Sequence, residues 1–246
     1  MIKILVNGIN GTMGKETAKL ILNNNKMHLL GGLDHHVSHN LPYKVFNNVD
    51  DIFEKPDVII DFSVAESTIS LLPYCIQYHI PIVIATTGFS GEQILNIKSA
   101  SKNIPIFHSS NMSYQIYLMN NIVSKLAQLL PESDIEILET HHNRKKDSPS
   151  GTALMLADSI NLATDNKYSY NFNRHDASTQ RDKNEIGFSS IRGGNIVGEH
   201  SVFFFNENET LEIKHTAHSR SIFAEGALKA TEFIIKQNSG YYTKLN

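Results

Sequence analysis

Residues 2–17, IKILVNGINGTMGKET, contain the pattern that decides the fold. The β-branched run IKILV (2–6) predicts a buried strand, and an amphipathic stretch with helical spacing follows the loop. The loop between them has a G-x-x-G-x-x-G spacing, with glycines at Gly8, Gly11 and Gly14. Such a turn lets the backbone approach a pyrophosphate and directs helix N–H groups at it. A tight strand-to-helix turn without a ligand would use the same glycines, so the pattern alone leaves both interpretations open.

The same alternation of strand and helix continues through the first 110 residues. Helical spacing is found in two stretches, 65–79 and 90–102. Short apolar runs that read as strands surround them at 28–34, 57–63, 80–88 and 104–110. Apolar strands separated by helices predict an α/β fold with right-handed connections, in which helices cover both faces of a parallel sheet. The sequence therefore predicts a Rossmann-like, doubly wound first domain.

The pattern changes after about residue 111. A helix at 113–130, a strand at 134–140, a helix opening near Ser150 and strands within 185–217 indicate an α+β module with a mainly antiparallel or mixed sheet. The polar segment 164–184 reads as a mobile surface excursion. Helical spacing returns at 219–237. We expect a dinucleotide-binding domain over 1–111, completed by 219–246, and a second domain over 112–218.

Composition excludes several classes of protein. The chain has 246 residues and a formal net charge of −3, which argues against a nucleic-acid-binding protein. Its single cysteine, Cys75, lies among apolar neighbours, which predicts a buried thiol and allows no intramolecular disulfide. No apolar run reaches about 18 residues and no signal-like segment precedes the first strand. We expect a cytoplasmic protein without a membrane segment.

Asp34 strengthens the dinucleotide interpretation. It ends the second predicted strand, 20 residues after Gly14, where a carboxylate meets the adenosine ribose hydroxyls. A carboxylate there suits NAD and repels a 2′-phosphate, and His35 and His36 are weakly basic near pH 7. The two histidines could equally form a solvated turn. We expect NADH to serve at least as well as NADPH. The ATTG stretch (85–88) ends a later strand, where its threonines could line the nicotinamide half of the cofactor or equally cap the following turn.

A second motif, ETHHNRKKDSPSGTA, occupies residues 139–153. The SPSGT run predicts the start of a helix, whose free N–H groups suit a carboxylate or phosphate. His141, His142 and Lys145 come directly before it, and a lysine ammonium or an imidazolium can act as a general acid. Solvated basic side chains are the plainer alternative. A metal site is not expected, because adjacent residues in an extended chain point to opposite faces.

With both motifs placed, the chain resembles the dihydrodipicolinate reductase family, now called the 4-hydroxy-tetrahydrodipicolinate reductases. The family signature has the form E-x-H-H-x-x-K-x-D-x-P-S-G-T-A, and residues 139–153 match it. The resemblance extends to GINGTMG, IDFS, ATTG, SSNMS, RGGNIVGEH and LEIKHTAHSR, and so covers nearly the whole chain. It implies a Rossmann-like cofactor domain completed by the C-terminal helix, a substrate domain, and a homotetramer built from substrate-domain sheets.

The resemblance also implies roles for individual residues. His141 is the expected acid/base histidine and Lys145 the expected proton donor. The cyclic dicarboxylate substrate is expected at His142, Ser150, Gly151 and Thr152. The NADH or NADPH cofactor is expected at Gly8, Ile9, Asn10, Gly11, Thr12, Met13, Asp34, Ala85, Thr86, Thr87, Ser109, Ser110, Asn111 and Met112.

The chain departs from the family pattern at several positions. Thr12 stands where many members have arginine, and His35 where another basic residue commonly follows the acidic one. Both departures weaken a 2′-phosphate site and agree with the expectation for NADH. The NMSYQIYLM stretch also differs from the family's small-residue pattern. Two other classes remain open from the residues alone: another two-domain reductase of amino-acid metabolism, and a non-catalytic nucleotide sensor.

Overall fold

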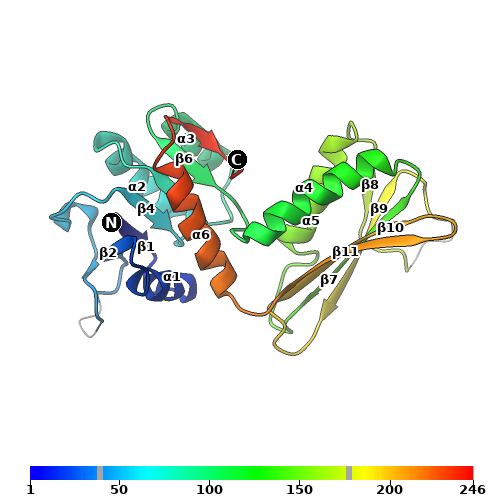
Figure 1. Cartoon of the computed structure of the whole chain (residues 1–246), viewed down its shortest axis with the longest axis horizontal. Coiled ribbons are helices and arrows are strands. Elements are labelled where there is room, and N and C mark those ends of the chain that lie inside the picture. The colour runs from blue at the N-terminus through cyan, green and yellow to red at the C-terminus, as the bar shows by residue number, and fades with distance from the viewer. Residues whose placement is uncertain (38–40, 176–178, 246) are drawn as a thin grey trace. The chain divides into compact units, whose positions relative to one another are not determined.

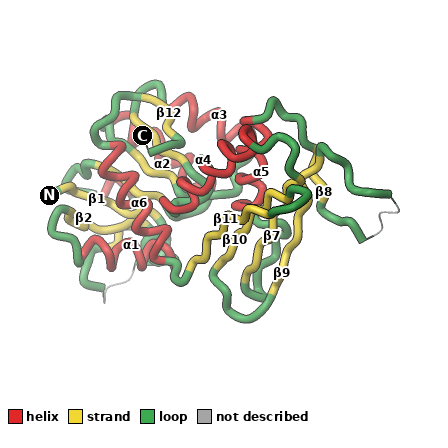
Figure 2. Tube along the Cα trace, turned by 45° about the vertical axis from the view of Figure 1, so that its right-hand side comes forward, coloured by secondary structure: helices red, strands yellow, loops and turns green. Residues whose placement is uncertain are grey.

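The computed structural model describes residues 1–37, 41–175 and 179–245. The chain divides into two compact units, Met1–Ser113 with Arg220–Asn246, and Tyr114–Ser219 (Figures 1 and 2). The second unit is thus inserted into the chain of the first. Among the helices of the described residues, none combines the length and apolar content that crossing a bilayer requires.

The first unit is built on a seven-stranded sheet of order β12-β6-β5-β4-β1-β2-β3, in which all the pairings are parallel. Its strands are β1 (Ile2–Asn7), β2 (Met27–Leu33), β3 (Val45–Phe46), β4 (Val58–Asp61), β5 (Ile82–Ile84), β6 (Pro105–His108) and β12 (Gly240–Tyr242). Its helices are α1 (Thr12–Leu22), the 3-10 helix η1 (Val49–Asp51), α2 (Ala65–Gln77), α3 (Gly91–Ala100) and α6 (Ser221–Ile234). The Rossmann-like prediction is confirmed.

Strand alternation divides the core of this unit between the two faces of the sheet. On β1, Ile4 and Val6 pack in one cluster with apolar residues of α1 and α6. Leu5 packs in the opposite cluster with residues of α2 and α3, and Cys75 is buried there as predicted. Side chains of a strand point alternately to both faces, so continuous apolar runs are what a doubly covered sheet requires.

Two strands at the edges of this sheet were not predicted. β12 adds to β6 through Gly240–Tyr242, and β3 adds to β2 through Val45–Phe46. Each has only two or three residues, too few to show a hydrophobic period.

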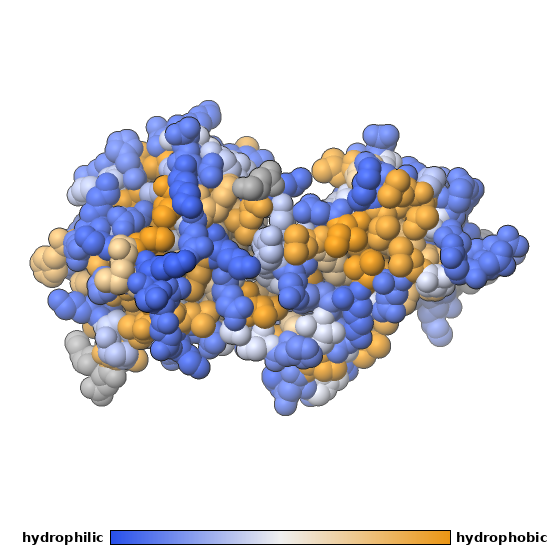
Figure 3. All heavy atoms as spheres, viewed as in Figure 1, coloured by the Kyte–Doolittle hydropathy of each residue, from blue (hydrophilic) through white to orange (hydrophobic). Residues whose placement is uncertain are grey.

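The second unit has a five-stranded mixed sheet of order β11-β10-β7-β9-β8. Its strands are β7 (Asp134–His141), β8 (Ser169–Asn171), β9 (Glu185–Arg192), β10 (Gly198–Phe205) and β11 (Thr210–Ala217), and its helices are α4 (Tyr114–Leu129) and α5 (Gly151–Ala163). The helices and one face of the sheet share a core that includes Ile135, Ile137, Val202 and Phe204. Apolar side chains also gather on the surface over α4 (Figure 3), where Leu118, Ile122 and Leu129 are exposed.

The prediction for segment 164–184 is wrong in part. Residues 169–171 form β8, an edge strand that pairs in parallel with β9. Arg181 anchors the later part of the segment through Asp134, Glu136 and the carbonyl oxygens of Ile135 and Glu185. The strand is only three residues long, and its pairing depends on β9, which lies further along the chain. Residues 176–178 of this segment lie outside the described residues.

Candidate active site

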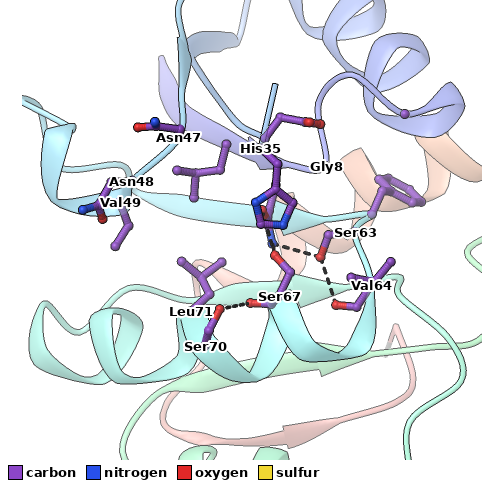
Figure 4. A pocket seen from close by; sticks show the side chains of 15 residues that line it. Gly8, His35, Asn47, Asn48, Val49, Ser63, Val64, Ser67, Ser70 and Leu71 are labelled. Carbon is purple, nitrogen blue, oxygen red and sulfur yellow. Dashed lines mark hydrogen bonds between the residues drawn. The ribbon is translucent and has the colours of Figure 1, made fainter. Parts of the chain in front are cut away.

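A cavity of about 490 Å³ lies in the first unit at the carboxyl ends of β4, β1 and β2, where the strand order reverses. Ligands of open α/β sheets bind at such a reversal point. The cavity is lined by Asn7, Gly8, Gly11, Leu33, Asp34, His35, Asn47, Asn48, Val49, Phe62, Ser63, Val64, Ser67, Ser70 and Leu71. Figure 4 shows the arrangement, with Ser67, Ser70 and Leu71 contributed by α2.

The glycine loop and Asp34 come together as the dinucleotide motif predicts. Asn10 N–H donates to Asp34 Oδ2 at 3.1 Å, and His36 N–H donates to Asp34 Oδ1 at 3.2 Å. The Asn10 side chain donates to the His36 carbonyl at 2.6 Å. His35 and His36 lie in the same exposed bend, and of the two His35 lines the cavity. The carboxylate is therefore fixed next to the glycine loop.

Two glycines test whether the loop fits a pyrophosphate. Gly8 has a φ of +76°, and a Cβ there would lie 2.6 Å from the Phe62 carbonyl oxygen. A Cβ on Gly14 would lie 2.2 Å from the Gly8 carbonyl oxygen. Gly11 is the N-cap of α1, and within the described residues it contributes no side-chain cap to the helix. The loop is thus folded tightly, with first-turn N–H groups of α1 unblocked by a capping side chain, which fits an anion.

The remaining predicted cofactor residues do not line this cavity. Thr86 is buried, and its hydroxyl donates to Asp61 Oδ2 at 3.1 Å, whereas Thr87 is exposed. Ser109 N–H donates to the Ile84 carbonyl at 3.2 Å, so this segment follows the neighbouring strand β6. The side chains of Ile9 and Met112 belong to the core of the unit. Thr12 and Ser110 are exposed, and Met13 is half-buried.

In the second unit, Glu139 joins the predicted acid/base histidine to the mouth of α5. Its Oε2 lies 2.5 Å from His141 Nδ1, and its Oε1 accepts a 3.1 Å hydrogen bond from Ser150 N–H. Arg192 donates to both oxygens at 2.8 and 2.7 Å, and Ser190 Oγ donates to Oε1 at 2.8 Å. Burial alone would raise the Glu139 pKa, but the hydrogen bonds from His141, Arg192 and Ser190 hold that pKa well below its usual range.

This contact determines which nitrogen of His141 can do chemistry. An ionised carboxylate can only accept, so Nδ1 carries a proton and donates to Glu139. Nε2 is then the nitrogen that can take up or release a proton at a substrate. His141 is 8% exposed, so the side chain is largely buried but still in contact with solvent.

Ser150 caps α5 and connects to a second buried histidine. Its Oγ accepts from Ala153 N–H at 3.2 Å and lies 3.0 Å from His200 Nε2. The helix predicted to open near Ser150 is confirmed, since α5 begins at Gly151. Burial, and then the positive charge of His141, lower the pKa of His200 to about 3. His200 is therefore neutral near pH 7 and adds no charge to the site.

The basic loop before α5 is ordered by several contacts. Lys145 Nζ lies 2.9 Å from Asp147 Oδ2, with only 20% of its side chain exposed. His142 N–H donates to the Ile196 carbonyl at 2.8 Å, and Lys145 N–H donates to the His142 carbonyl at 3.1 Å. Arg144 donates to Asn195 Oδ1 at 3.0 Å, away from the carboxylate of Glu139. Gly151 is exposed and Thr152 is half-buried at the start of α5.

Several residues of these sites carried no predicted role. Glu139 was recognised only as part of a signature, and Arg192, Ser190 and His200 were not assigned. The signal for Glu139 was its position two residues before His141, which places both side chains on one face of a strand. Ser63, the last residue of the IDFS motif, and Ser67, four residues later, line the first cavity but have no predicted role either.

Two family models match the chain almost end to end. The model for the dihydrodipicolinate reductase N-terminus matches residues 2–112, and the model for the C-terminus of the same proteins matches residues 115–245. The chain belongs to the dihydrodipicolinate reductase family. The resemblance seen in the sequence is therefore confirmed.

Several relatives with full-length similarity carry the name 4-hydroxy-tetrahydrodipicolinate reductase. A 4-hydroxy-tetrahydrodipicolinate reductase of Caldanaerobacter subterraneus subsp. tengcongensis is 45% identical over 243 residues, covering 99% of this chain and 96% of that protein. One of Clostridium novyi is 43% identical over 244 residues, with the same coverage of 99% and 96%. The solved structure of a dipicolinate-bound dihydrodipicolinate reductase from Paenisporosarcina sp. TG-14 is 25% identical, with a TM-score of 0.81 and coverage of 100% and 98%.

Proposed function

We propose that this family member catalyses the NAD(P)H-dependent reduction of 4-hydroxy-tetrahydrodipicolinate to tetrahydrodipicolinate, a step of lysine and diaminopimelate biosynthesis. The observation that carries the proposal is the Glu139 contact, which joins His141 to the capped mouth of α5. A proton-transfer group beside an anion-binding helix terminus is what a carboxylated ring requires while it is reduced. Curated relatives with 45% and 43% identity over 99% of the chain carry the corresponding name.

In the proposed mechanism, bound NAD(P)H would supply the hydride for C4 of the cyclic substrate, and the 4-hydroxyl would leave as water after it takes up a proton. Lys145 is the proton donor beside the ring, and His141 Nε2 is the acid/base group. His142, Ser150, Gly151 and Thr152 hold the two carboxylates, with backbone N–H groups at the start of α5 as donors. Glu139 keeps the His141 ring in one tautomer and one orientation.

The glycine loop 8–13, Asp34, Ala85–Thr87 and Ser109–Met112 are proposed to hold the cofactor. NADH is the preferred or equal donor in this proposal. Asp34 carries a negative charge where a 2′-phosphate would lie, and Thr12, at the first position of α1, has no charge to offset it. Lys15, which is exposed one turn into α1, offsets this in part.

We further propose a homotetramer formed through the face of the second sheet that α4 and α5 leave uncovered. The pairing register places Leu138, Phe203 and Ile191 on that face. Phe203 and Phe205 stack there with ring centroids 5.4 Å apart. Exposed aromatic and aliphatic side chains on a sheet face are typical of subunit interfaces. Light scattering should give the mass of four chains, and Phe203→Glu should lower it.

The decisive experiment follows loss of absorbance at 340 nm with freshly generated 4-hydroxy-tetrahydrodipicolinate, with NADH and NADPH compared side by side. Rapid oxidation, with NADH at least equal to NADPH, supports the function and the cofactor preference. A strong preference for NADPH keeps the function and contradicts the argument from Asp34. NADH binding without turnover would favour a nucleotide sensor or another two-domain reductase.

A further inference from the structure

Asp61 is a buried carboxylate with no assigned part in the reaction. It ends β4 in the centre of the parallel sheet, between β1 and β5, and is 0% exposed. It does not line the cavity at the carboxyl ends of the strands, although its neighbours Phe62 and Ser63 do. Burying a carboxylate is costly unless hydrogen bonds compensate it. The hydrogen-bond partners of Asp61 therefore indicate its structural role.

Five hydrogen bonds from described residues converge on this carboxylate. Oδ1 accepts from Asn7 Nδ2 at 2.9 Å and from the N–H and hydroxyl of Ser63 at 3.1 and 2.5 Å. Oδ2 accepts from Thr86 Oγ1 at 3.1 Å and from the hydroxyl of Thr68. Burial raises the pKa of Asp61, and hydrogen bonds from Ser63, Thr68 and Thr86 oppose that rise. Five donors are enough to fill all of the roughly four lone-pair positions of a carboxylate.

Thr68 lies in α2, and the other three donor residues come from the ends of three adjacent strands. Asn7 is the last residue of β1 and precedes Gly8 of the glycine loop. Ser63 follows β4, and Thr86 lies in the ATTG stretch that follows β5. Main-chain bonds add to the same junction, since Phe62 N–H donates to the Asn7 carbonyl and Ala85 N–H donates to the Asp61 carbonyl.

Through Asn7, the hydrogen-bond network of Asp61 includes residues that line the cavity. Asn7 Nδ2 also donates to Ser63 Oγ and Ser67 Oγ, both at 3.0 Å (Figure 4). Asn7, Ser63 and Ser67 all line the cavity. One buried carboxylate thus fixes the polar side chains of Asn7 and Ser63, which line the cavity. Through Thr86 it also fixes the segment that follows β5.

We propose that Asp61 is a positioning residue for the cofactor: without touching it, Asp61 holds the start of the glycine loop, Ser63 and the Thr86 segment in the one arrangement that binds NADH. The proposal rests on the assignment of the cofactor to this unit. The carboxylate acts by hydrogen-bond geometry. An amide of the same shape can replace it, because it accepts at one atom and donates at the other while the threonine hydroxyls rotate.

A pair of matched threonines separates positioning from plain stability. Thr68 and Thr231 are both 0% exposed in helices of the first unit. The Thr68 hydroxyl bonds to Asp61, whereas the Thr231 hydroxyl donates to the Ala227 carbonyl at 2.9 Å within α6. Each is replaced by valine, and the Kd of NADH is measured by fluorescence without substrate, together with Tm.

Thr68→Val should raise the Kd of NADH by about three- to tenfold, as loss of one supporting hydrogen bond predicts. Thr231→Val should leave that Kd unchanged while lowering Tm to a similar degree. In steady-state assays, Thr68→Val should raise the KM of NADH and leave the KM of the dicarboxylate unchanged. Equal NADH affinity in the two valine variants would overturn the proposal.

Substitution of Asp61 itself tests the geometry. Asp61→Ala should weaken NADH binding more than Thr68→Val does, and Asp61→Asn should recover most of the affinity. Equal loss in the alanine and asparagine variants would overturn the geometric role. If the wild-type protein does not bind NADH, the cofactor site and this proposal fail together. If the wild-type protein binds NADH, and Thr68→Val and Thr231→Val have the same Kd for NADH, this proposal alone is overturned.

Discussion

Glu139 Oε2 lies 2.5 Å from His141 Nδ1, and the same carboxylate receives two hydrogen bonds from the Arg192 guanidinium at 2.7 and 2.8 Å. Glu139 is 1% exposed, so these contacts replace its hydration almost entirely. A charged, bidentate pair of this kind fixes a side chain more firmly than a single neutral hydrogen bond does. The orientation of His141 is therefore set by a carboxylate that is itself held in place.

Replacing Glu139 with glutamine should lower kcat/KM by about 10²-fold, because the carboxamide cannot accept both the His141 proton and the Arg192 pair. Stopped-flow or steady-state assays measure the loss, and circular dichroism checks the fold. Glu136→Gln is the matched control. It lies on the same strand but on the opposite face, where it pairs with Arg181. A kcat/KM near wild type in Glu139→Gln would contradict the orienting role.

Replacing Lys145 with alanine should lower kcat by about 10²- to 10⁴-fold, since the proposed proton donor is lost. NADH binding should remain unchanged, because Lys145 belongs to the other unit. The adjacent Lys146 is exposed, and Lys146→Ala should keep near-normal turnover. Turnover near wild type in Lys145→Ala would show the donor assignment to be wrong, with Lys146 the next candidate.

Two serine caps allow stability and substrate binding to be separated. Ser150 caps α5 and Ser90 caps α3, each accepting a hydrogen bond of 3.2 Å from an N–H group in the first turn. Alanine at either position should cost about 1 kcal/mol of stability. Only Ser150→Ala should also raise the KM for the dicarboxylate, by about tenfold, because its hydroxyl lies at the proposed carboxylate site. A matching rise in Ser90→Ala would contradict that placement.

Acidification should destabilise the second unit before it protonates ordinary carboxylates. The pKa of His200 is lowered from 6.5 to about 3 by burial and by the charge of His141. Between these values the unfolded state binds a proton that the folded state does not, so stability falls as the pH drops below 6.5. The depressed pKa of Glu139 adds a loss in the same direction below pH 4.5.

His200→Asn removes the first of these contributions. Between about pH 7 and pH 5, the wild-type protein should lose about 1–2 kcal/mol more stability than this variant does. The free energy of unfolding is measured in urea at each pH, with hydrogen exchange of backbone amides in β7 and β10 as the probe of the second unit. Parallel pH dependences for the two proteins would show that His200 is not held neutral by the fold.

The local parts of the fold were predictable, and the non-local parts were not. Runs such as IKILV and DVIID show their burial directly, because a doubly covered sheet needs apolar residues on both faces. Asp34 was predictable because its distance along the chain from the glycine loop reflects one strand–helix–strand unit. The edge strands β3, β8 and β12 were not, since each depends on pairing with a partner rather than on its own pattern.

The same distinction holds for the sites. Arg192 meets Glu139 only because β9 pairs in parallel with β7, with His141 opposite Arg192 and Glu139 opposite Ser190. No spacing in the sequence encodes that register. Asn7, Ser63 and Thr86 likewise meet at Asp61 because β1, β4 and β5 are neighbours in the sheet. Strand order brings these groups together, and strand order follows from tertiary packing.

The pairing of β12 with β6 has a consequence for synthesis of the chain. Since α6 and β12 complete the first unit, its sheet keeps an open edge at β6 until residue 242 has left the ribosome. The second unit, contiguous from Tyr114 to Ser219, is finished earlier. The residues of the second unit are therefore all synthesised before the first unit can be completed, and the β6 edge stays without its β12 partner during that time.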